Sequence, residues 1–249
     1  MNPAALNDPP DAAPPDDAVA LSASLLAAMR ALDVTVTPEA AALARALGGV
    51  RPGAIPPEGG ARVAFWVNVY NALMRHAVVA LDLPAGSRVP LGVFSRASYL
   101  LGGQRFSLNT IEHGVLRRNR PAPFALRRPL RDDDPRLGAM PATFDPRVHF
   151  ALNCAAASCP PIRAYSADGV DRELDLATRG YVEQETTLDR PRERVRLPAL
   201  CWLYSRDFGA RREALRWVSA YLPDDDRRWV EAHPKARVSF NGYRWGVVR

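Results

Sequence analysis

Long apolar runs are missing from this sequence. No stretch of about 18 consecutive apolar residues occurs among the 249, which argues against a membrane-spanning helix. The first 17 residues, MNPAALNDPPDAAPPDD, contain neither a basic segment nor an apolar one, so they do not look like a secretory signal. We therefore expect a cytoplasmic protein with no membrane span.

Cysteine is also scarce, with only 3 residues. An odd and small number does not suit the disulfide framework of a secreted protein. Cys154 and Cys159 lie close together, whereas Cys201 lies in an apolar segment. No second Cys/His pair occurs at a matching spacing, so we predict neither a metal site nor a bound cofactor.

Lysine is nearly absent, because Lys235 is the only one among 33 basic residues. The net charge of +6 comes from arginines scattered among acidic residues, without a block of like charges. Phosphate-binding loops, dinucleotide fingerprints and basic stretches interleaved with aromatics are missing too. We therefore do not expect a nucleic-acid partner. The expected partner is an unidentified small-molecule or peptide substrate.

The composition that remains, 47% hydrophobic and 24% charged, is typical of a globular protein. Residues 1–17 are rich in Pro, Asp and Ala and are predicted to be a disordered tail. Residues 18–54 are predicted to hold two short amphipathic helices, the second capped by Thr37, and residues 55–249 to form one domain. The predicted fold class is α+β: a helix-rich single domain around a buried central helix, with small antiparallel hairpins.

Residues 61–81 give the strongest helix pattern, with apolar residues around nearly the whole circumference. Asn68, Asn71 and Arg75 are spaced i, i+3 and i+7, so they share one face of this central helix. Buried amides need hydrogen-bond partners. The stripe therefore either braces neighbouring loops, which is the preferred interpretation, or lines a binding site.

The remaining elements follow from turn and capping residues. We expect hairpins at 98–108 and around Asn241-Gly242, strands within 147–153 and 193–198, and helices over 110–119, 170–185, 198–209, 212–223 and 224–234.

Two candidate residues fall in the first turn of the helix predicted to begin after Asn109. With Asn109 as N-cap, Glu112 stands where its carboxylate reaches back to the cap, in a capping box. His113 follows, and the positive end of the helix disfavours imidazolium, which keeps the ring neutral and able to act as a base.

The stretch HFALNCAAASCPPI, residues 149–162, leaves several interpretations open. Asn153 is expected to cap a short helical turn that places Cys154 near its N-terminus, where backbone N–H groups lower a thiol pKa. His149 is a second candidate base. A redox-linked disulfide between Cys154 and Cys159 and a buried, inert packing role are the alternatives.

As a set, the blocks FWVNVYNALMRHAV, FSLNTIEHGVLR, VHFALNCAAASCPPI, LCWLYSRDFG and YRWGV resemble the domain of unknown function 547 family, in its bacterial stand-alone form, over roughly residues 55–248. The resemblance implies a conserved domain without an established activity. Its motifs fall on the following positions: Tyr70, Asn71, Glu112, His113, Arg117, His149, Asn153, Cys154 and Cys159.

The resemblance also brings two departures. Plant members often have serine or glycine at the cysteine positions, which implies that a thiol mechanism is not general to the family. Members tend to have an aspartate before the closing tryptophan, whereas Arg244 precedes Trp245 here. If that aspartate orients a catalytic histidine, Glu112 or Asp207 has to replace it in this chain.

Three hypotheses about function follow. In the first, the protein is a thiol-dependent hydrolase or acyl transferase with Cys154 as nucleophile and His113 or His149 as base. The groups expected to orient or bind around it are Asn71, Asn153, Glu112, Tyr70, Arg75, Arg117 and Cys159. In the second, the same residues form a buried polar network in a non-catalytic binding or scaffold domain. In the third, Cys154 and Cys159 are a redox-active dithiol.

Overall fold

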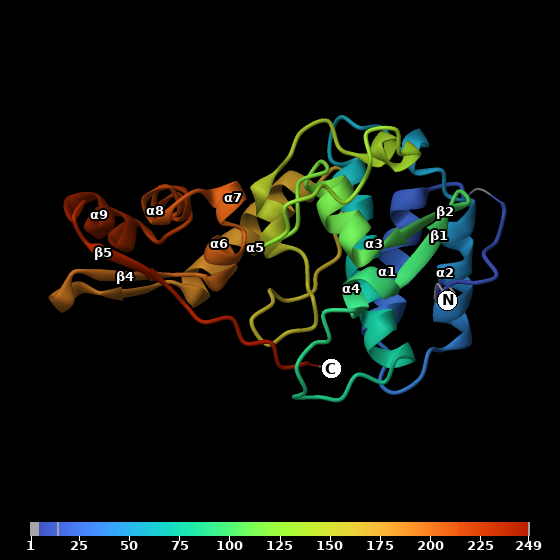
Figure 1. Ribbon diagram of the computed structural model, residues 1–249, viewed down its shortest axis with the longest axis horizontal. Coiled ribbons are helices and arrows are strands. Elements are labelled where there is room, and N and C mark those ends of the chain that lie inside the picture. Colours follow the sequence, from blue (N-terminus) through green and yellow to red (C-terminus); the bar gives the residue numbers. More distant parts are fainter. Residues whose placement is uncertain (1–4, 14, 249) are drawn as a thin grey trace.

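The computed structural model describes residues 5–13 and 15–248 and shows a helix-rich α+β domain with two hydrophobic cores (Figure 1). The first core is built around the central helix, and the second lies in the sequence between about 181 and 240. Phe150 belongs to the second core although its neighbours in sequence belong to the first, so residues 148–151 form a junction between the cores.

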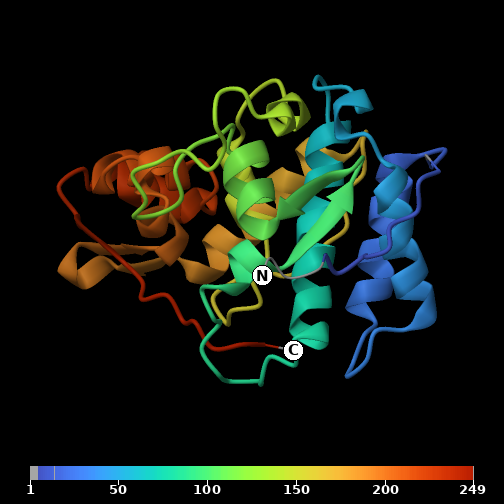
Figure 2. The ribbon, with the colours of Figure 1, turned by 45° about the vertical axis from the view of Figure 1, so that its right-hand side comes forward.

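Helix α3 (Ala61–Ala80) is the central helix that the sequence predicts, and most of its residues are buried. Helix α1 (Ala18–Arg30) packs beside it, and α2 (Pro38–Ala46) packs against α1 (Figure 2). The Oγ1 of Thr37 accepts a hydrogen bond from the N–H of Ala40, and Pro38 occupies the first helical position, so the predicted start of α2 is confirmed.

A hairpin completes the first core. Strands β1 (Ser98–Leu101) and β2 (Gln104–Ser107) pair antiparallel after the short helix α4 (Val93–Arg96). Gly102 and Gly103 form the turn with positive φ angles of 54° and 77°, a conformation that suits glycine. This hairpin is as predicted.

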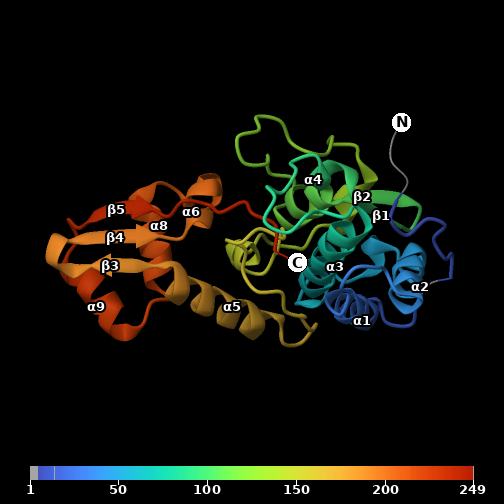
Figure 3. The same ribbon diagram turned by 90° about the horizontal axis from the view of Figure 1, so that it is seen from below.

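The second core is covered by α5 (Val170–Glu185) and by a three-stranded sheet (Figure 3). Strand β3 (Thr187–Asp189) pairs antiparallel with β4 (Arg194–Leu197), which pairs parallel with β5 (Arg237–Phe240). The segment predicted as one helix over 198–209 is split at Tyr204, and the remaining helices of this half are α6 (Ala199–Leu203), α7 (Ser205–Phe208), α8 (Arg211–Ser219) and α9 (Asp224–Ala232).

The predicted hairpin at Asn241-Gly242 is wrong. Strand β5 finds its partner in β4 instead, and the N–H of Asn241 donates to the carbonyl of Leu197 at the end of that ladder. Figure 1 shows the chain after β5 running back toward the first core. Long-range pairing therefore overrides a strong local turn pattern.

Residues 243–248, which we name the closing segment, lie between two other parts of the chain. On one side the N–H of Val89 donates to the carbonyl of Trp245 at 2.9 Å. On the other side the N–H of Ala157 donates to the carbonyl of Gly246, also at 2.9 Å. The closing segment thus joins the loop 86–89 to the loop that carries the cysteines.

Two short segments near the site also differ from the prediction. The stretch expected as a strand, 147–153, begins as a 3₁₀ helix, η5 (Pro146–Phe150), because the Asp145 carboxylate accepts from the N–H of Arg147 and starts a turn. The helix expected over 110–119 is a π-helix, η3 (Thr110–Leu116). Asn109 does not cap it and donates to the Ser95 hydroxyl instead.

Residues 1–17 are expected to be disordered, but hydrogen bonds hold the tail at Leu6 and Asn7, near the start of the described residues. The N–H of Leu6 donates to the carbonyl of Ser98, and the buried Asn7 bonds to the backbone of Ala44 and Leu100. The tail therefore adds to the edge of the hairpin. The prediction for positions 1–4 and 14 lies outside the described residues.

Within the described ranges, none of the helices combines the length and apolar character needed to cross a bilayer.

The polar stripe of α3 makes bracing contacts, as preferred. The Asn68 amide donates to the carbonyl of Tyr165 at 2.9 Å and accepts from the N–H of the same residue at 2.9 Å. Arg75 donates to the carbonyl of Leu32 at 2.9 Å. Each of these side chains ties a distant loop to the central helix.

Replacing Asn68 by Ala leaves the N–H and carbonyl of Tyr165 without their partner in a buried position. We expect the free energy of unfolding to fall by about 2 kcal/mol, measured by urea denaturation. Asn109→Ala is the matched control, since its amide binds only a hydroxyl in an exposed pair, and its effect should stay within about 0.5 kcal/mol. Equal effects of the two substitutions would contradict this account of the stripe.

Candidate functional site

The loop that carries the two cysteines is held by asparagine side chains. The Oδ1 of Asn153 accepts from the N–H of Ala155 at 2.7 Å, and its Nδ2 donates to the carbonyl of Pro160 at 2.8 Å. Asn71 of α3 accepts from the N–H of Asn153 at 2.8 Å and donates to the carbonyl of Ala151 at 3.0 Å. One side chain therefore fastens both ends of the loop, and another anchors it to the central helix.

This loop places two free thiols in contact. The Sγ atoms of Cys154 and Cys159 are 2.7 Å apart, and both residues are half-buried and not disulfide-bonded. The N–H of Cys154 points to the Sγ of Cys159 at 3.0 Å. The hydroxyl of Tyr243, in the closing segment, lies 3.1 Å from one sulfur and 3.2 Å from the other.

These contacts make the two thiols unequal. Donation of the thiol proton to Cys159, followed by burial, raises the pKa of Cys154 well above the usual range. Burial also tends to raise the pKa of Cys159, but the hydrogen bonds from Cys154, from the Tyr243 hydroxyl and from the backbone N–H of Cys154 outweigh it and hold that pKa below the usual value. The first negative charge of the pair therefore resides on Cys159.

The predicted capped turn is thus corrected. Asn153 begins a tight turn without helical residues, and Ala155 lies in the left-handed region with φ of 61°. Among the backbone N–H groups of this turn, that of Cys154 points to the sulfur of Cys159. The lowered thiol pKa belongs to Cys159 and not to Cys154.

Beside the dithiol lies a buried polar cluster built from both halves of the chain. It combines residues of α3, η3, η5 and the α6–α7 region, and its members are Tyr70, Glu112, His113, Arg117, His149, Tyr204 and Asp207. In the π-helix η3 the N–H of Arg117 donates to the carbonyl of Glu112, five residues back, at 2.8 Å. Such helices recur at functional sites, where they redirect side chains.

Asp207 is the centre of this buried polar cluster, and its side chain has no exposed area. It accepts from the Nε of Arg117 at 2.7 Å, from the Nη1 of Arg120 at 2.8 Å and from the Nε2 of His149 at 2.9 Å. Burial tends to raise the pKa of Asp207, but the hydrogen bonds from His149 and Arg117 hold it far below the usual range. Asp207 therefore remains a carboxylate at neutral pH.

His149 is held by that carboxylate on one edge. Its ring stacks on Tyr204 with centroids 3.8 Å apart, and its Nδ1 is buried without a hydrogen-bond partner in the described part of the chain. Burial lowers the pKa of His149, so the ring is neutral at pH 7. The resemblance leaves either Glu112 or Asp207 to orient a histidine. Asp207 is the one that accepts a hydrogen bond from His149.

Glu112 is not a capping residue. It accepts from the hydroxyl of Tyr70 at 3.0 Å and from that of Tyr204. Burial works against its charge, but His113 and the Tyr204 hydrogen bond lower the pKa of Glu112 below its usual value. The capping box is therefore corrected: a tyrosine pair, one member from each half of the molecule, holds this carboxylate.

His113 is neutral, as predicted, although for a different reason. Its pKa is lowered first by burial, which outweighs the opposite effect of Glu112. The Nη1 of Arg117 lies 3.1 Å from its Nδ1, and because arginine only donates, this nitrogen is the unprotonated one. The proton of the neutral ring is consequently on Nε2.

The cysteines and the buried polar cluster are neighbours, and Tyr70 lies where they meet. Burial and the charge of Glu112 raise the pKa of Tyr70, and the neighbouring thiols add to this effect. Burial and Glu112 act in the same direction on the pKa of Tyr204. Across residues 5–13 and 15–248, however, no histidine nitrogen lies within hydrogen-bond distance of a cysteine sulfur. The Cys154–histidine pair therefore stays a prediction.

The site contains two residues that the sequence did not single out, Tyr204 in the buried polar cluster and Tyr243 beside the thiols. Tyr243 contacts both sulfurs, and its position in the YRWGV block was the only sequence feature that pointed to it. In contrast, Arg75, one of the binding residues expected from the sequence, donates to the carbonyl of Leu32 in a different loop.

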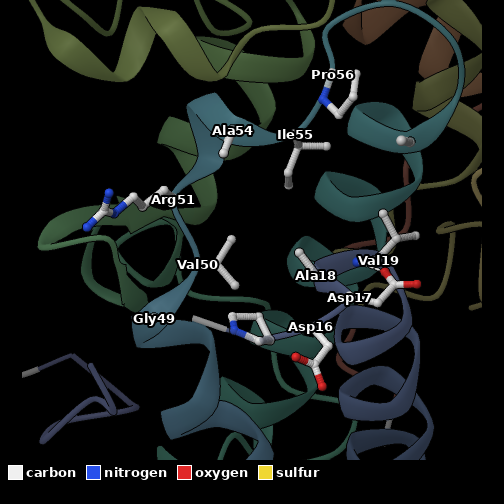
Figure 4. A pocket seen from close by; sticks show the side chains of 12 residues that line it. Asp16, Asp17, Ala18, Val19, Gly49, Val50, Arg51, Ala54, Ile55 and Pro56 are labelled. Atoms are coloured by element: carbon white, nitrogen blue, oxygen red, sulfur yellow. Dashed lines mark hydrogen bonds between the residues drawn. The ribbon is translucent and has the colours of Figure 1, made fainter. Parts of the chain in front are cut away.

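The cavities do not coincide with the dithiol. One of about 540 Å³ lies between the start of α1, the segment 49–56 and the start of α3 (Figure 4). Its lining is mostly apolar, and the Asp17 carboxylate there already caps α1. A smaller one of about 120 Å³ is lined in part by Arg117 and Tyr204, so it adjoins the buried polar cluster. The small cavity lies beside buried titratable groups, which gather at functional sites.

No group of three or more His, Cys, Asp or Glu residues that could hold a metal ion occurs within the described ranges.

Comparison with known proteins gives one family. The model of a family described as "Protein of unknown function, DUF547" matches residues 58–182. Neither the curated proteins nor the solved structures contain a match to the chain. The matched range includes both cysteines, Tyr70 and η3, whereas Tyr204, Asp207 and Tyr243 lie beyond it.

Replacing Asp207 by Asn leaves the buried Arg117 without its counter-ion. We expect the free energy of unfolding at pH 7 to fall by about 3 kcal/mol. Because the folded-state pKa of Asp207 is depressed, the stability it contributes is present above about pH 4 and is lost as the pH falls. The difference between wild type and variant, measured by urea denaturation from pH 7 to pH 3, should therefore shrink with acidification.

Asp224→Asn serves as the control for this substitution. Asp224 forms an exposed pair with Arg227, so its loss should change the free energy of unfolding by no more than about 0.5 kcal/mol. A wild-type advantage over Asp207→Asn that stays constant down to pH 3 would show that the carboxylate charge is not what stabilises the cluster.

Proposed function

The chain belongs to the DUF547 family of proteins of unknown function, and on that premise we propose that it is a redox-active dithiol protein whose Cys154–Cys159 pair exchanges with a disulfide substrate. The observation that carries the proposal is the contact between two free thiols of unequal acidity on a fastened loop. Of the three hypotheses drawn from the sequence, this one uses the contacts that the sulfurs make.

The exchange begins at Cys159. Its thiolate attacks one sulfur of a substrate disulfide, a mixed disulfide forms, and the other substrate sulfur leaves as a thiolate. That leaving group takes the proton of Cys154. The Cys154 thiolate then attacks the Sγ of Cys159, the internal disulfide forms, and the second substrate sulfur leaves as a thiolate. Two electrons pass from the dithiol to the substrate.

Each contact of the pair has a place in this scheme. The hydrogen bonds from Cys154 and Tyr243 stabilise the attacking thiolate of Cys159. The loop keeps the second thiol beside the first, so closure of the internal disulfide is an intramolecular step. The raised pKa of Cys154 keeps it protonated until the mixed disulfide removes the negative charge of Cys159.

The hydrolase or acyl-transferase hypothesis has one supporting observation, the His149–Asp207 pair in the neighbouring cluster. This hypothesis requires Cys154 to be a thiolate and a histidine to lie beside it. The raised pKa of Cys154 instead keeps its thiol protonated. The scaffold hypothesis accounts for Asn68, Asn71 and Asn153, whose amides bind backbone groups, but it gives no role to two adjacent thiols.

Alkylation by iodoacetamide, mapped by peptide as a function of pH, tests which thiol is reactive. We expect Cys159 to be modified first, with a midpoint below the ordinary thiol pKa of about 8.5. Cys201 is the internal control, since burial raises its pKa to about 12 and it should stay unmodified in the folded protein. Modification of Cys154 ahead of Cys159 would favour the nucleophile of the hydrolase hypothesis instead.

Substitution of each cysteine tests the exchange itself. With a small aromatic disulfide as substrate, Cys159→Ser should abolish thiol release, whereas Cys154→Ser should release one equivalent and trap a mixed disulfide that mass spectrometry detects on Cys159. Cys201→Ser should behave like the wild type. If Cys154→Ser turned over like the wild type, Cys154 would not be the resolving thiol and the proposal would fail.

A further inference from the structure

The small cavity beside the buried polar cluster has the composition of an anion site. Its volume is about 120 Å³, and it lies between the loop 121–124 and the α6–α7 region. The lining residues come from η3 and these two segments: Arg117, Pro121, Pro123, Phe124, Leu203, Tyr204, Ser205 and Arg206.

Arg117 presents an unused donor to this cavity. The residue is only 1% exposed, its Nε binds Asp207, and its Nη1 binds His113 and the carbonyl of Pro121. The Nη2 has no hydrogen-bond partner among the described residues, and it is not one of the atoms sealed from solvent. Nη2 is thus the nitrogen of this buried guanidinium that is left for a ligand in the cavity that Arg117 lines.

The charges around the cavity do not balance. Arg117, Arg120 and Arg206 contribute three positive charges, while Asp207 and Glu112 contribute two negative ones. The two histidines of the buried polar cluster are neutral. Arg206 donates to the carbonyl of Ala125 at 2.6 Å and has no carboxylate partner in the described ranges. Of the two arginines that line the cavity, Arg206 is therefore the one without a carboxylate partner among the described residues.

The outer wall of the cavity is aromatic. Phe124 is 75% exposed, and its ring packs against that of Trp202 with centroids 5.5 Å apart. Phe124 also adopts a positive φ of 63°, which is unfavourable for a bulky residue, so the loop holds the ring at the mouth at some cost. A large exposed ring beside a guanidinium provides an apolar surface next to an anion-binding group.

We propose that this cavity binds a carboxylate attached to a short apolar or aromatic group. The carboxylate accepts from the Nη2 of Arg117 and from Arg206, in the geometry that guanidinium groups favour. The apolar part lies against Phe124 and Trp202. About 120 Å³ is enough for a carboxylate and a few carbon atoms, since a water molecule in the liquid occupies about 30 Å³. The site does not depend on the proposed dithiol chemistry.

The carboxylate can belong to a free acid or to the C-terminus of a peptide, and binding measurements distinguish the two. Isothermal titration calorimetry on the full chain compares phenylacetate with phenylacetamide, and the dipeptide Gly-Phe with its C-terminal amide. We expect each acid to bind at least about tenfold more tightly than its neutral amide. Tighter binding of the dipeptide acid than of phenylacetate identifies a peptide terminus as the source, and the reverse identifies a free acid.

Variants at the rim locate the binding without disturbing the buried Arg117. Arg206→Gln should weaken binding of the preferred acid by about tenfold, and Phe124→Ala should weaken both the acid and its amide. Arg128→Gln is the matched control, an exposed arginine four residues after Phe124 that pairs with Asp132 and does not line the cavity. A double Cys154→Ser, Cys159→Ser variant should bind like the wild type.

Several results would overturn the assignment. The guanidinium groups would have no role if the amides bound as tightly as the acids. The same would follow if the acids bound equally well to Arg206→Gln and to the wild type. Ser205→Trp, which fills the cavity mouth with a large ring, should abolish binding while circular dichroism stays unchanged. Retained binding in that variant, or failure of both acids to bind the folded wild type at millimolar concentration, would refute the site.

Discussion

The buried ion pair between Arg117 and Asp207 joins the two halves of the molecule. Arg117 comes from η3 of the first core, and Asp207 from α7 at the edge of the second. Neither side chain has more than 1% exposed area, so each charge depends on the other for compensation. The relative position of the cores is therefore coupled to this contact. His149, at the junction between the cores, donates from its Nε2 to the same carboxylate.

The parts of the fold that the sequence predicts correctly are those in which one local force decides. Thr37 followed by Pro38 starts a helix because side-chain and backbone preferences agree there. The Gly102-Gly103 turn works in the same way for the first hairpin. In α3 the apolar circumference predicts burial, and the stripe with Asn68 predicts contacts to loops, without saying which loops.

The errors occur where distant segments compete with local preference. Asn241-Gly242 is a strong hairpin pattern, but β4 offers β5 a longer ladder. Asn109 and Glu112 have the spacing of a capping box. The Glu112 carboxylate is bound instead by two tyrosine hydroxyls, one before and one after it in the sequence, each more than 40 residues away. Tertiary contacts of this kind leave no periodicity in the sequence. The same reason explains why the sequence suggested the site residues as a set but not the unequal roles of the two thiols.

Through Tyr243 of the closing segment, the hydrogen bonding of the two thiols depends on residues far from them in the sequence. Between Cys159 and Tyr243 the chain passes through the whole second core before it returns to the sulfurs. Folding of the intervening residues brings the two ends of this loop together and so lowers the entropic cost of the contact. The reactivity of the thiols is thus a measure of the integrity of a region that does not touch them. Damage confined to β3–β5 would therefore be detected first as a change in the reactivity of Cys154 and Cys159.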